Sequence, residues 1–520
     1  MGVERSRSLS RKTRLRLLGS VIALAAAVRL YLFWQYYCIN SDGVRYIGEA
    51  KDFFFGRNSA ALSSLDPPLY PLLVALLYSW VGDWELSGQL WSLASGVLLM
   101  LPLYGLLKDI YGERAALVGC ALAAIGPYLA RYSAHVRTES IYLLLFTTAV
   151  WLFYRGIQGR SLARLFYGGL VAGLAYLTRP EAVGLLVIVP VTLVLIQWNR
   201  KNYGWGWLSR GSLCVALGFF IFALPYVWYL SREAGEWMIS RKAGLTLGIS
   251  LRESGLLGPE EAKLVPDLES LGTVRFAARY PWVYAKKVAL DFFPSVGAYF
   301  EAIHYAYVPF LLLGMVRPLR LRERKDLLLW VALFFYLVGF TLIYVKRRYA
   351  LQLLPLSLGW TAIGVLFCWD ALKQRWSGWP LKAAVAGLGL TLLGSTLPKT
   401  LKPISQDKAH VREAGRYLRA QGRSAELRLL VFDDRVAFYA DAQPLHLAEL
   451  EEQALIGILR SGKADYVVTE VSRWRKRHPS VALHPESFGL RLEKQFSAGG
   501  EPVSIFRVTA VTAAGGKGLF

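Results

Sequence analysis

Apolar blocks of about twenty residues recur along most of this chain, and they constrain its fold more than any other feature. Each block has roughly the length that an α-helix needs to cross the hydrocarbon core of a bilayer, about 30 Å. The blocks lie at 17–36, 88–107, 115–133, 140–156, 165–178, 181–198, 211–230, 303–316, 326–344, 350–369 and 380–397. They predict a polytopic α-helical membrane protein with about eleven transmembrane helices.

The distribution of Lys and Arg predicts the orientation. If the basic segment RSRSLSRKTRLR is cytoplasmic, the linkers that fall inside hold more than twice as many Lys and Arg as the short segments outside. This assignment of sides requires that the segment 67–81, PPLYPLLVALLYSWV, lies at the interface and does not cross the membrane. Its prolines and its short length favour that position. The segments 37–87 and 231–302 are then outer loops, the second with amphipathic stretches suited to the membrane face.

Charge and cysteine content exclude other classes. The net charge of +23 does not indicate a nucleic-acid-binding protein, because the basic residues lie in short clusters between the apolar blocks. Orientation and contact with anionic membrane lipids account for it better. The cysteines lack metal-ligand and CxxC spacing and are interpreted as core residues: Cys38, Cys120, Cys214 and Cys368. The first block continues into aromatic residues, which favours a spanning helix over a cleavable signal.

After Pro398 the pattern becomes that of a soluble α/β domain, so the predicted domains are 1–398 and 399–520. Strands are predicted at 427–432, 465–469 and 504–508, and helices at 407–421 and 448–460. Their alternation implies a largely parallel sheet, placed outside by parity. Asp433 and Asp434 are interpreted as turn or capping residues, and the terminal TAAGGKGLF as disordered.

Ionisable residues are concentrated at the short junctions between spans on the predicted outer side. Such groups are costly at membrane depth and are candidates for function. The triplet Lys346–Arg348 lies on the side that the orientation rule leaves poor in positive charge. We expect it to bind an anion, a lipid phosphate above all, because Arg offers forked donors that match phosphate oxygens. Anchoring to outer head groups is the alternative.

Asp42 lies in NSDG, directly after the first span. Such a carboxylate is either a helix cap or a general base that takes the proton of a bound hydroxyl. Glu139 and Asp66 would orient the acceptor in the second case. A divalent cation (Mg²⁺, Mn²⁺, Ca²⁺ or Zn²⁺) held by Asp42, Asp66, Glu139 or His135 is an open alternative, with no cofactor otherwise expected.

The order of several motifs resembles the GT-C glycosyltransferases of the PMT/aminoarabinose-transferase superfamily. The motifs are SDGVRYIGEAKDFFFG, DPPLYPLL, KDIYGERAAL, RYSAHVRTESIYLLLF, LTRPEAVGLL and RRYALQLLPLSLGW, after a basic first span. This resemblance implies a polyprenyl-phosphate sugar donor, inversion at the anomeric carbon, and an Asp of the first outer loop as base. It also implies an active site on the non-cytoplasmic, periplasmic face of a bacterial-type inner membrane.

The resemblance and the junction residues together define the predicted site. The catalytic candidates are Asp42, Glu139 and Asp66, and the donor phosphate ligands are Lys346, Arg347, Arg348, Arg179 and Arg137. The acceptor or loop candidates are Arg45, Tyr46, Tyr70, His135, Glu181 and Tyr349. The acceptor is a lipid, glycan or protein, and the chain is expected to be a monomer or weak oligomer. The alternative functions are a lipid flippase or transporter, which would carry charges near the middle of its spans, and a non-catalytic membrane scaffold.

Overall fold

The computed structural model describes residues 10–200, 204–253, 274–316, 325–421, 427–497 and 501–509. The chain forms two compact units. The membrane unit comprises Met1–Phe33 and Glu49–Lys402, and the α/β unit comprises Trp34–Gly48 and Pro403–Phe520. The segment 34–48 therefore belongs to the α/β unit, whereas the predicted division after residue 398 assigns it to the membrane domain. Parts of the basic terminus, of the loop 231–302 and of the linker 317–325, and the terminal TAAGGKGLF, lie outside the described residues.

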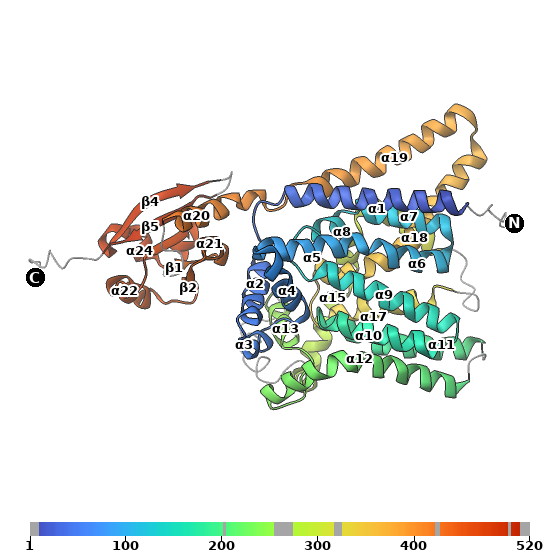
Figure 1. Ribbon diagram of the computed structural model, residues 1–520, viewed down its shortest axis with the longest axis horizontal. Coiled ribbons are helices and arrows are strands. Elements are labelled where there is room, and N and C mark those ends of the chain that lie inside the picture. The colour runs from blue at the N-terminus through green and yellow to red at the C-terminus, as the bar shows by residue number, and fades with distance from the viewer. Residues whose placement is uncertain are drawn as a thin grey trace, which may run out of the picture. The chain divides into compact units, whose positions relative to one another are not determined.

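The membrane unit is built from helices (Figure 1). Its first half contains α1 (Arg11–Trp34), α2 (Ser41–Phe54, shared with the α/β unit), α3 (Asn58–Leu62), α4 (Leu69–Val81), α5 (Trp84–Leu98), α6 (Met100–Tyr111), α7 (Glu113–Ile125), α8 (Pro127–Tyr132), α9 (Glu139–Gln158) and α10 (Leu162–Tyr176). Its second half contains the 3-10 helix η1 (Pro180–Gly184), α11 (Leu185–Arg200), α12 (Trp205–Ala234), α13 (Lys242–Glu253), α15 (Pro281–Ile303), η3 (Tyr305–Tyr307), α16 (Val308–Met315), α17 (Leu327–Leu342), η5 (Arg347–Gln352), α18 (Leu353–Arg375) and α19 (Gly378–Leu401).

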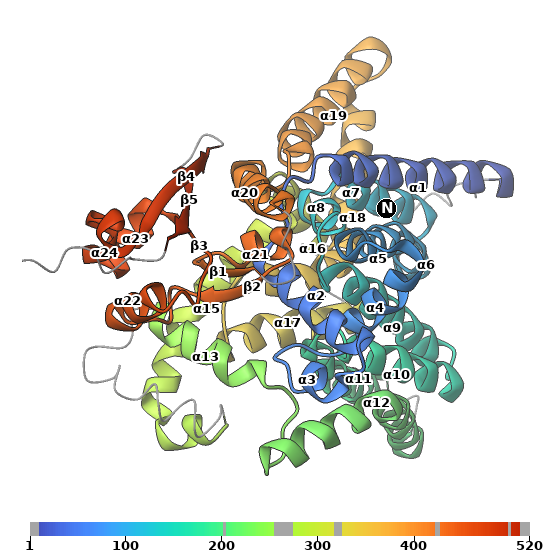
Figure 2. The ribbon, with the colours of Figure 1, turned by 60° about the vertical axis from the view of Figure 1, so that its left-hand side comes forward.

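Seven helices of the described residues are long and apolar enough to cross a membrane, or eight if one bent pair counts as a span. Three shorter apolar helices, α4, α10 and α17, accompany them. The block 115–133 is interrupted at Gly126, and α15 turns by 90° into η3 and α16. A polytopic helical membrane protein is confirmed, while the number of eleven spans stays a prediction. The first part of helix α19 leans away from the other helices (Figure 1 and Figure 2), and only 6% of its apolar window is buried.

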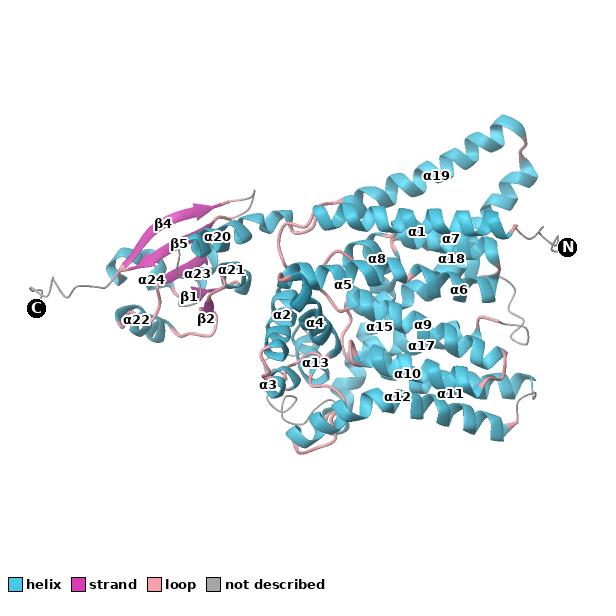
Figure 3. Ribbon diagram, in the orientation of Figure 1, coloured by secondary structure: helices cyan, strands magenta, loops and turns pink. Residues whose placement is uncertain are grey.

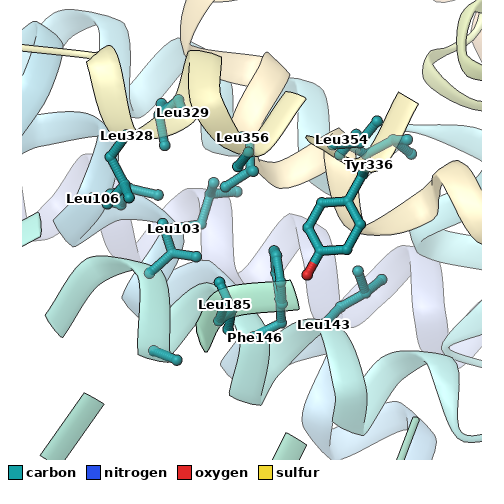
Figure 4. Close-up of a cluster of buried hydrophobic side chains, with 14 of the residues drawn as sticks. Leu103, Leu106, Leu143, Phe146, Leu185, Leu328, Leu329, Tyr336, Leu354 and Leu356 are labelled. Atoms are coloured by element: carbon teal, nitrogen blue, oxygen red, sulfur yellow. The ribbon is translucent and has the colours of Figure 1, made fainter. Parts of the chain in front are cut away.

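A continuous apolar core joins the helices of the membrane unit. Figure 4 shows part of it, where leucines of α6, α9, α11, α17 and α18 surround Phe146 and Tyr336. The two aromatic rings meet edge to face with centroids 5.8 Å apart. The hydroxyl of Tyr336 donates a hydrogen bond to the carbonyl oxygen of Glu181 at 3.0 Å. The core therefore ends, at η1, in a polar group.

Glycines allow α10 and α12 to approach closely. A Cβ at Gly218 would lie 2.3 Å from the carbonyl oxygen of Phe166, and one at Gly169 would lie 2.4 Å from that of Val215. Backbone oxygens at such distances leave no room for a methyl group, so these positions require glycine. Small residues serve the same purpose in many membrane proteins, where van der Waals packing between helices replaces the hydrophobic effect.

The α/β unit contains a five-stranded mixed sheet in the order β2-β1-β3-β5-β4. Its strands are drawn in magenta in Figure 3. Strands β1 (Arg428–Val431), β2 (Gln443–His446) and β3 (Tyr466–Glu470) are parallel, while β4 (Leu490–Phe496) and β5 (Val503–Val508) are antiparallel. The helices are α20 (Ala409–Ala420), α21 (Asp434–Ala440), α22 (Glu452–Arg460), α23 (Val471–Arg477) and α24 (Pro479–Leu483). The predicted α/β domain is confirmed. The sequence missed β2 and β4, the two edge strands, because their exposed polar residues interrupt the apolar pattern.

We expect Gly218→Ala to lower the thermal midpoint of the detergent-solubilised protein, because its methyl group forces α10 and α12 apart. Overpacking of this kind costs about 1–3 kcal/mol. Gly206→Ala on the same helix is the matched control, since nothing lies within 4 Å of its added Cβ. Equal midpoints for the two variants, measured by scanning fluorimetry, would contradict the close helix contact.

Candidate active site

Arg179 lies between two carboxylates at one end of the membrane unit. Its Nη1 is 3.1 Å from Glu139 Oε1, and its Nη2 donates to Glu181 Oε1 at 2.7 Å. Arg137 adds a second positive charge, 3.7 Å from Glu139. Arg179 and Glu139 are both buried, so each needs the other to offset the loss of hydration. Two cations and two anions therefore form one balanced cluster, called the Arg179 cluster below.

Aromatic rings connect the Arg179 cluster to η5. The guanidinium of Arg179 lies over the rings of Tyr142 and Tyr349, with centroid distances of 5.6 and 5.5 Å. Tyr142 donates from its hydroxyl to Gln352 Oε1 at 3.0 Å. Because a cation over a ring face gains most when both are desolvated, these contacts favour one fixed position of η5 beside α9. The candidate residue Tyr349 is thus part of the cluster's wall.

The three basic residues of the predicted phosphate site each contact a different aromatic ring. Lys346 Nζ lies 4.5 Å from the ring centroid of Tyr344, and Arg348 lies 5.3 Å from that of Tyr349. Arg347 lies over the Tyr128 ring.

Arg347 also forms an ion pair with Glu301 near the end of α15, which the sequence interpretation missed. A lone acidic residue in the apolar stretch AYFEAIHYAYV was the available signal.

Asp66 is paired with a cation that the sequence did not single out. Lys242 Nζ, at the start of α13, donates to Asp66 Oδ1 at 2.6 Å, and Asp66 is only 1% exposed. The carbonyl oxygen of Leu177 accepts from the N–H of Leu69 at 2.9 Å, which ties the start of α4 to the end of α10. Tyr70 is buried and donates to the carbonyl oxygen of Gly88. Asp66 and Tyr70 therefore stabilise the amino-terminal end of α4.

The predicted metal ligands of the membrane unit do not form a metal site. No group of three ligand-type side chains converges in the part of the chain that the structure describes. Asp66 and Glu139 are each paired with a basic side chain instead. Burial, together with the charges of Arg137 and Arg131, lowers the pKa of His135 well below its usual value, so its ring is neutral at neutral pH. Asp66 and Glu139, each engaged by a basic side chain, do not fit a divalent cation, and we derive no step through one.

Asp42, Arg45 and Tyr46 lie in the α/β unit, at the start of α2. Asn40 Oδ1 accepts from the N–H of Gly43 at 2.9 Å, so Asn40 caps the helix. Asp42 is the second residue of α2 and is 3.4 Å from Arg45, whose guanidinium lies over the Tyr46 ring. The capping role considered for Asp42 is thus filled by its neighbour Asn40.

An apolar groove of about 720 Å³ runs between α11 and α17. Its walls include Val187 and Val191 on one side and Phe334, Val338 and Gly339 on the other. Helix α11 directly follows η1, the turn that carries Glu181 after Arg179. One wall of the groove therefore follows the Arg179 cluster directly in the sequence.

We expect a thermodynamic coupling of about 1–3 kcal/mol between Asp66 and Lys242 in a double-mutant cycle. Asp66→Asn and Lys242→Gln each leave a poorly exposed charge without its partner, so the double variant should lose less than the sum of the two. Apparent unfolding midpoints of the four proteins give the coupling. The exposed pair of Asp52 on α2 and Arg57 in the following turn is the control, with a coupling below about 1 kcal/mol. Additive effects at Asp66 and Lys242 would refute the pairing.

Residues 66–229 match a family model described as dolichyl-phosphate-mannose-protein mannosyltransferase. A search of the curated proteins finds no match. Among solved structures, ArnT from Cupriavidus metallidurans bound to undecaprenyl phosphate has 14% identity and a TM-score of 0.59, covering 96% of this chain and 99% of that one.

Two structures from Archaeoglobus fulgidus are similar to the same degree. The oligosaccharyltransferase in its apo form has 13% identity and a TM-score of 0.59, covering 89% of this chain and 70% of its own. The oligosaccharyltransferase AglB in complex with an inhibitory peptide and a dolichol-phosphate has 14% identity and the same TM-score, covering 90% and 70%. These likenesses show a shared fold over most of the chain, and the family match lies within it. The resemblance carried by the sequence motifs is confirmed: residues 66–229 match a family model of the PMT type, and the chain shares the fold of the GT-C glycosyltransferases ArnT and oligosaccharyltransferase.

Proposed function

We propose that this glycosyltransferase moves one sugar from a polyprenyl phosphate to a hydroxyl or phosphate of a lipid, glycan or protein, at the non-cytoplasmic face of the membrane. The family match and the two neighbours with a bound polyprenyl phosphate support the donor class. The excess of Lys and Arg in the predicted inner linkers supports the orientation.

The groove between α11 and α17 carries the proposal. A polyprenyl phosphate has a long apolar tail and an anionic head, and this protein has an apolar groove on α11, the helix that directly follows the polar Arg179 cluster in the chain. Gly339 in the groove wall has open space around its Cβ position. We assign the tail to this groove, which would shield it from water without burying polar groups.

The donor phosphate is assigned to the triplet Lys346–Arg348. The guanidinium of Arg179 is already forked onto Glu181 and paired with Glu139, so its role is to position η5 through Tyr349. Arg137 has a similar place beside Glu139. Basic groups of the triplet stabilise the negative charge that grows on the phosphate as its bond to the sugar breaks.

Asp42 is assigned as the base. It takes the proton from the acceptor hydroxyl while that oxygen forms a bond to the anomeric carbon. The bond between that carbon and the donor phosphate oxygen breaks on the opposite side, and its electron pair leaves with the polyprenyl phosphate. The configuration is therefore inverted. With an acceptor phosphate, which carries no proton to remove, Asp42 would only orient the attacking group.

We expect Asp42→Asn to lower the rate of sugar transfer by about 100-fold or more, in the range that positioned general bases contribute. The assay uses purified protein, labelled polyprenyl-phosphate sugars and membrane lipid extracts, with products identified by mass spectrometry. Asp52→Asn on the same helix is the control and should keep the wild-type rate. A folded Asp42→Asn protein with the wild-type rate would refute the base. Lipid movement across vesicles without transfer would support a flippase instead.

We expect Gly339→Phe to weaken the binding of undecaprenyl phosphate by about tenfold, because the ring occupies part of the groove that the tail would fill. This corresponds to about 1.4 kcal/mol, less than full burial of one large apolar side chain. Gly387→Phe on α19 is the control, since its Cβ position is also open. Binding is measured by native mass spectrometry of the detergent-solubilised protein. Unchanged affinity in a folded Gly339→Phe variant would show that the tail binds elsewhere.

A further inference from the structure

We propose that the α/β unit acts as a clamp on the chain's own segment 35–40 and so positions Asp42, with Tyr439 as the main positioning residue. The proposal rests on the function given above for the role of Asp42. It assigns a task to the carboxy-terminal domain that is distinct from catalysis.

Backbone hydrogen bonds form the first half of the clamp. The N–H of Tyr37 donates to the carbonyl oxygen of Ile404 at 3.0 Å, and the N–H of Ile404 donates to that of Gln35 at 2.8 Å. Tyr36 and Ile404 form a parallel β-bridge. These bonds join the stretch after α1 to the stretch after α19, and both belong to the α/β unit.

Side chains of α20 and α21 form the second half. Tyr439 Oη accepts a hydrogen bond from the N–H of Ile39 at 2.7 Å. Arg412 Nη1 donates to the carbonyl oxygens of Tyr36 and Tyr37 at 3.4 Å each, and its guanidinium lies over the Tyr439 ring at 5.3 Å. Cys38 and Ile39 are fully buried. A buried N–H without an acceptor is costly, so the Tyr439 hydroxyl stabilises this position of the segment.

The clamp is close to the candidate base. Ile39 is followed by the helix cap Asn40, and α2 begins at Ser41. Asp42 is therefore the third residue after Ile39. A short, capped connection of this kind transmits a displacement of the backbone to the carboxylate. Because a misplacement of about 1 Å can cost about 100-fold in rate, a fixed segment is important for a general base.

The acidic residues at the carboxyl end of the parallel strands have other partners. Ligands of such sheets commonly bind at this edge. Here Asp433 caps α21 and pairs with Arg435, and Glu470 pairs with Arg473 at 2.9 Å. Asp434 lies 3.0 Å from His446. Burial raises the pKa of Asp433, but its hydrogen bonds and ion pair with Arg435 outweigh this and lower it. The acidic side chains of this edge thus have partners within the domain itself, which favours a holding role over a catalytic one.

Tyr439→Phe tests the clamp, because it removes the acceptor oxygen and keeps the buried ring. We expect the rate at which a maleimide labels Cys38 to rise about 3- to 10-fold, the range that one lost hydrogen bond allows. Labelling is quantified on the Cys38 peptide by mass spectrometry, which separates it from the other three cysteines. We also expect kcat to fall while KM for the donor stays the same. Arg412→Met should likewise raise the rate of Cys38 labelling and lower kcat.

Tyr417→Phe is the matched control, since Tyr417 donates to Glu493 at 2.8 Å within the same unit. It should leave labelling and kcat unchanged. Wild-type labelling of Cys38 in a folded Tyr439→Phe protein would overturn the clamp. Faster labelling with an unchanged kcat would overturn its role in positioning. Cys38 labelling does not depend on catalysis, so it tests the clamp even if Asp42→Asn refutes the proposed base.

Discussion

The pairing of buried charges at one end of an apolar bundle is the constraint on which the candidate site depends. A single ion at such a depth costs several kcal/mol, so Arg179 is stable there only with Glu139 and Glu181 beside it. The three residues come from the start of α9 and from η1. Their pairing therefore fixes where these elements begin, and the tyrosines whose rings lie under Arg179 extend the same constraint to η5.

The cluster separates two tasks among the basic residues. A guanidinium that already binds two carboxylates is a poor ligand for a further anion, whereas it is well suited to hold neighbouring elements in place. Under the proposed function, this distinction favours a positioning role for Arg179 and leaves the donor phosphate to the triplet Lys346–Arg348, in which Arg347 has one carboxylate partner, Glu301. The groove beside α11 is apolar, as the proposed site for the tail of a lipid donor requires. An amphipathic donor matches this combination better than a soluble sugar nucleotide would.

The α/β unit has three parallel strands with helices between them, and two antiparallel strands at one side of the sheet. Its side chains and backbone bind a segment of the same chain. Backbone groups of an irregular segment need partners when they are buried, and the stretch 35–40 finds them in Ile404, Arg412 and Tyr439. Such a domain would influence a reaction without contributing a catalytic group.

The sequence by itself determined the class of fold, because apolar blocks long enough to span a bilayer permit few alternatives to a helical bundle. It also placed an α/β domain after the last span, while the grouping of the ionisable junctions into one site stays a prediction. The breaks at Gly126 and His304 were not evident, since a bend leaves the hydrophobic pattern unchanged.

Only the tertiary structure decided the partners of the site residues. Glu301 for Arg347 and Lys242 for Asp66 depend on which helices meet, and local sequence carries no record of that. The contact between Ile39 and Tyr439 joins residues 400 positions apart. Hydrophobic periodicity reports the environment of a residue along its own helix or strand, whereas a hydrogen bond between distant segments exists only once the whole chain has folded.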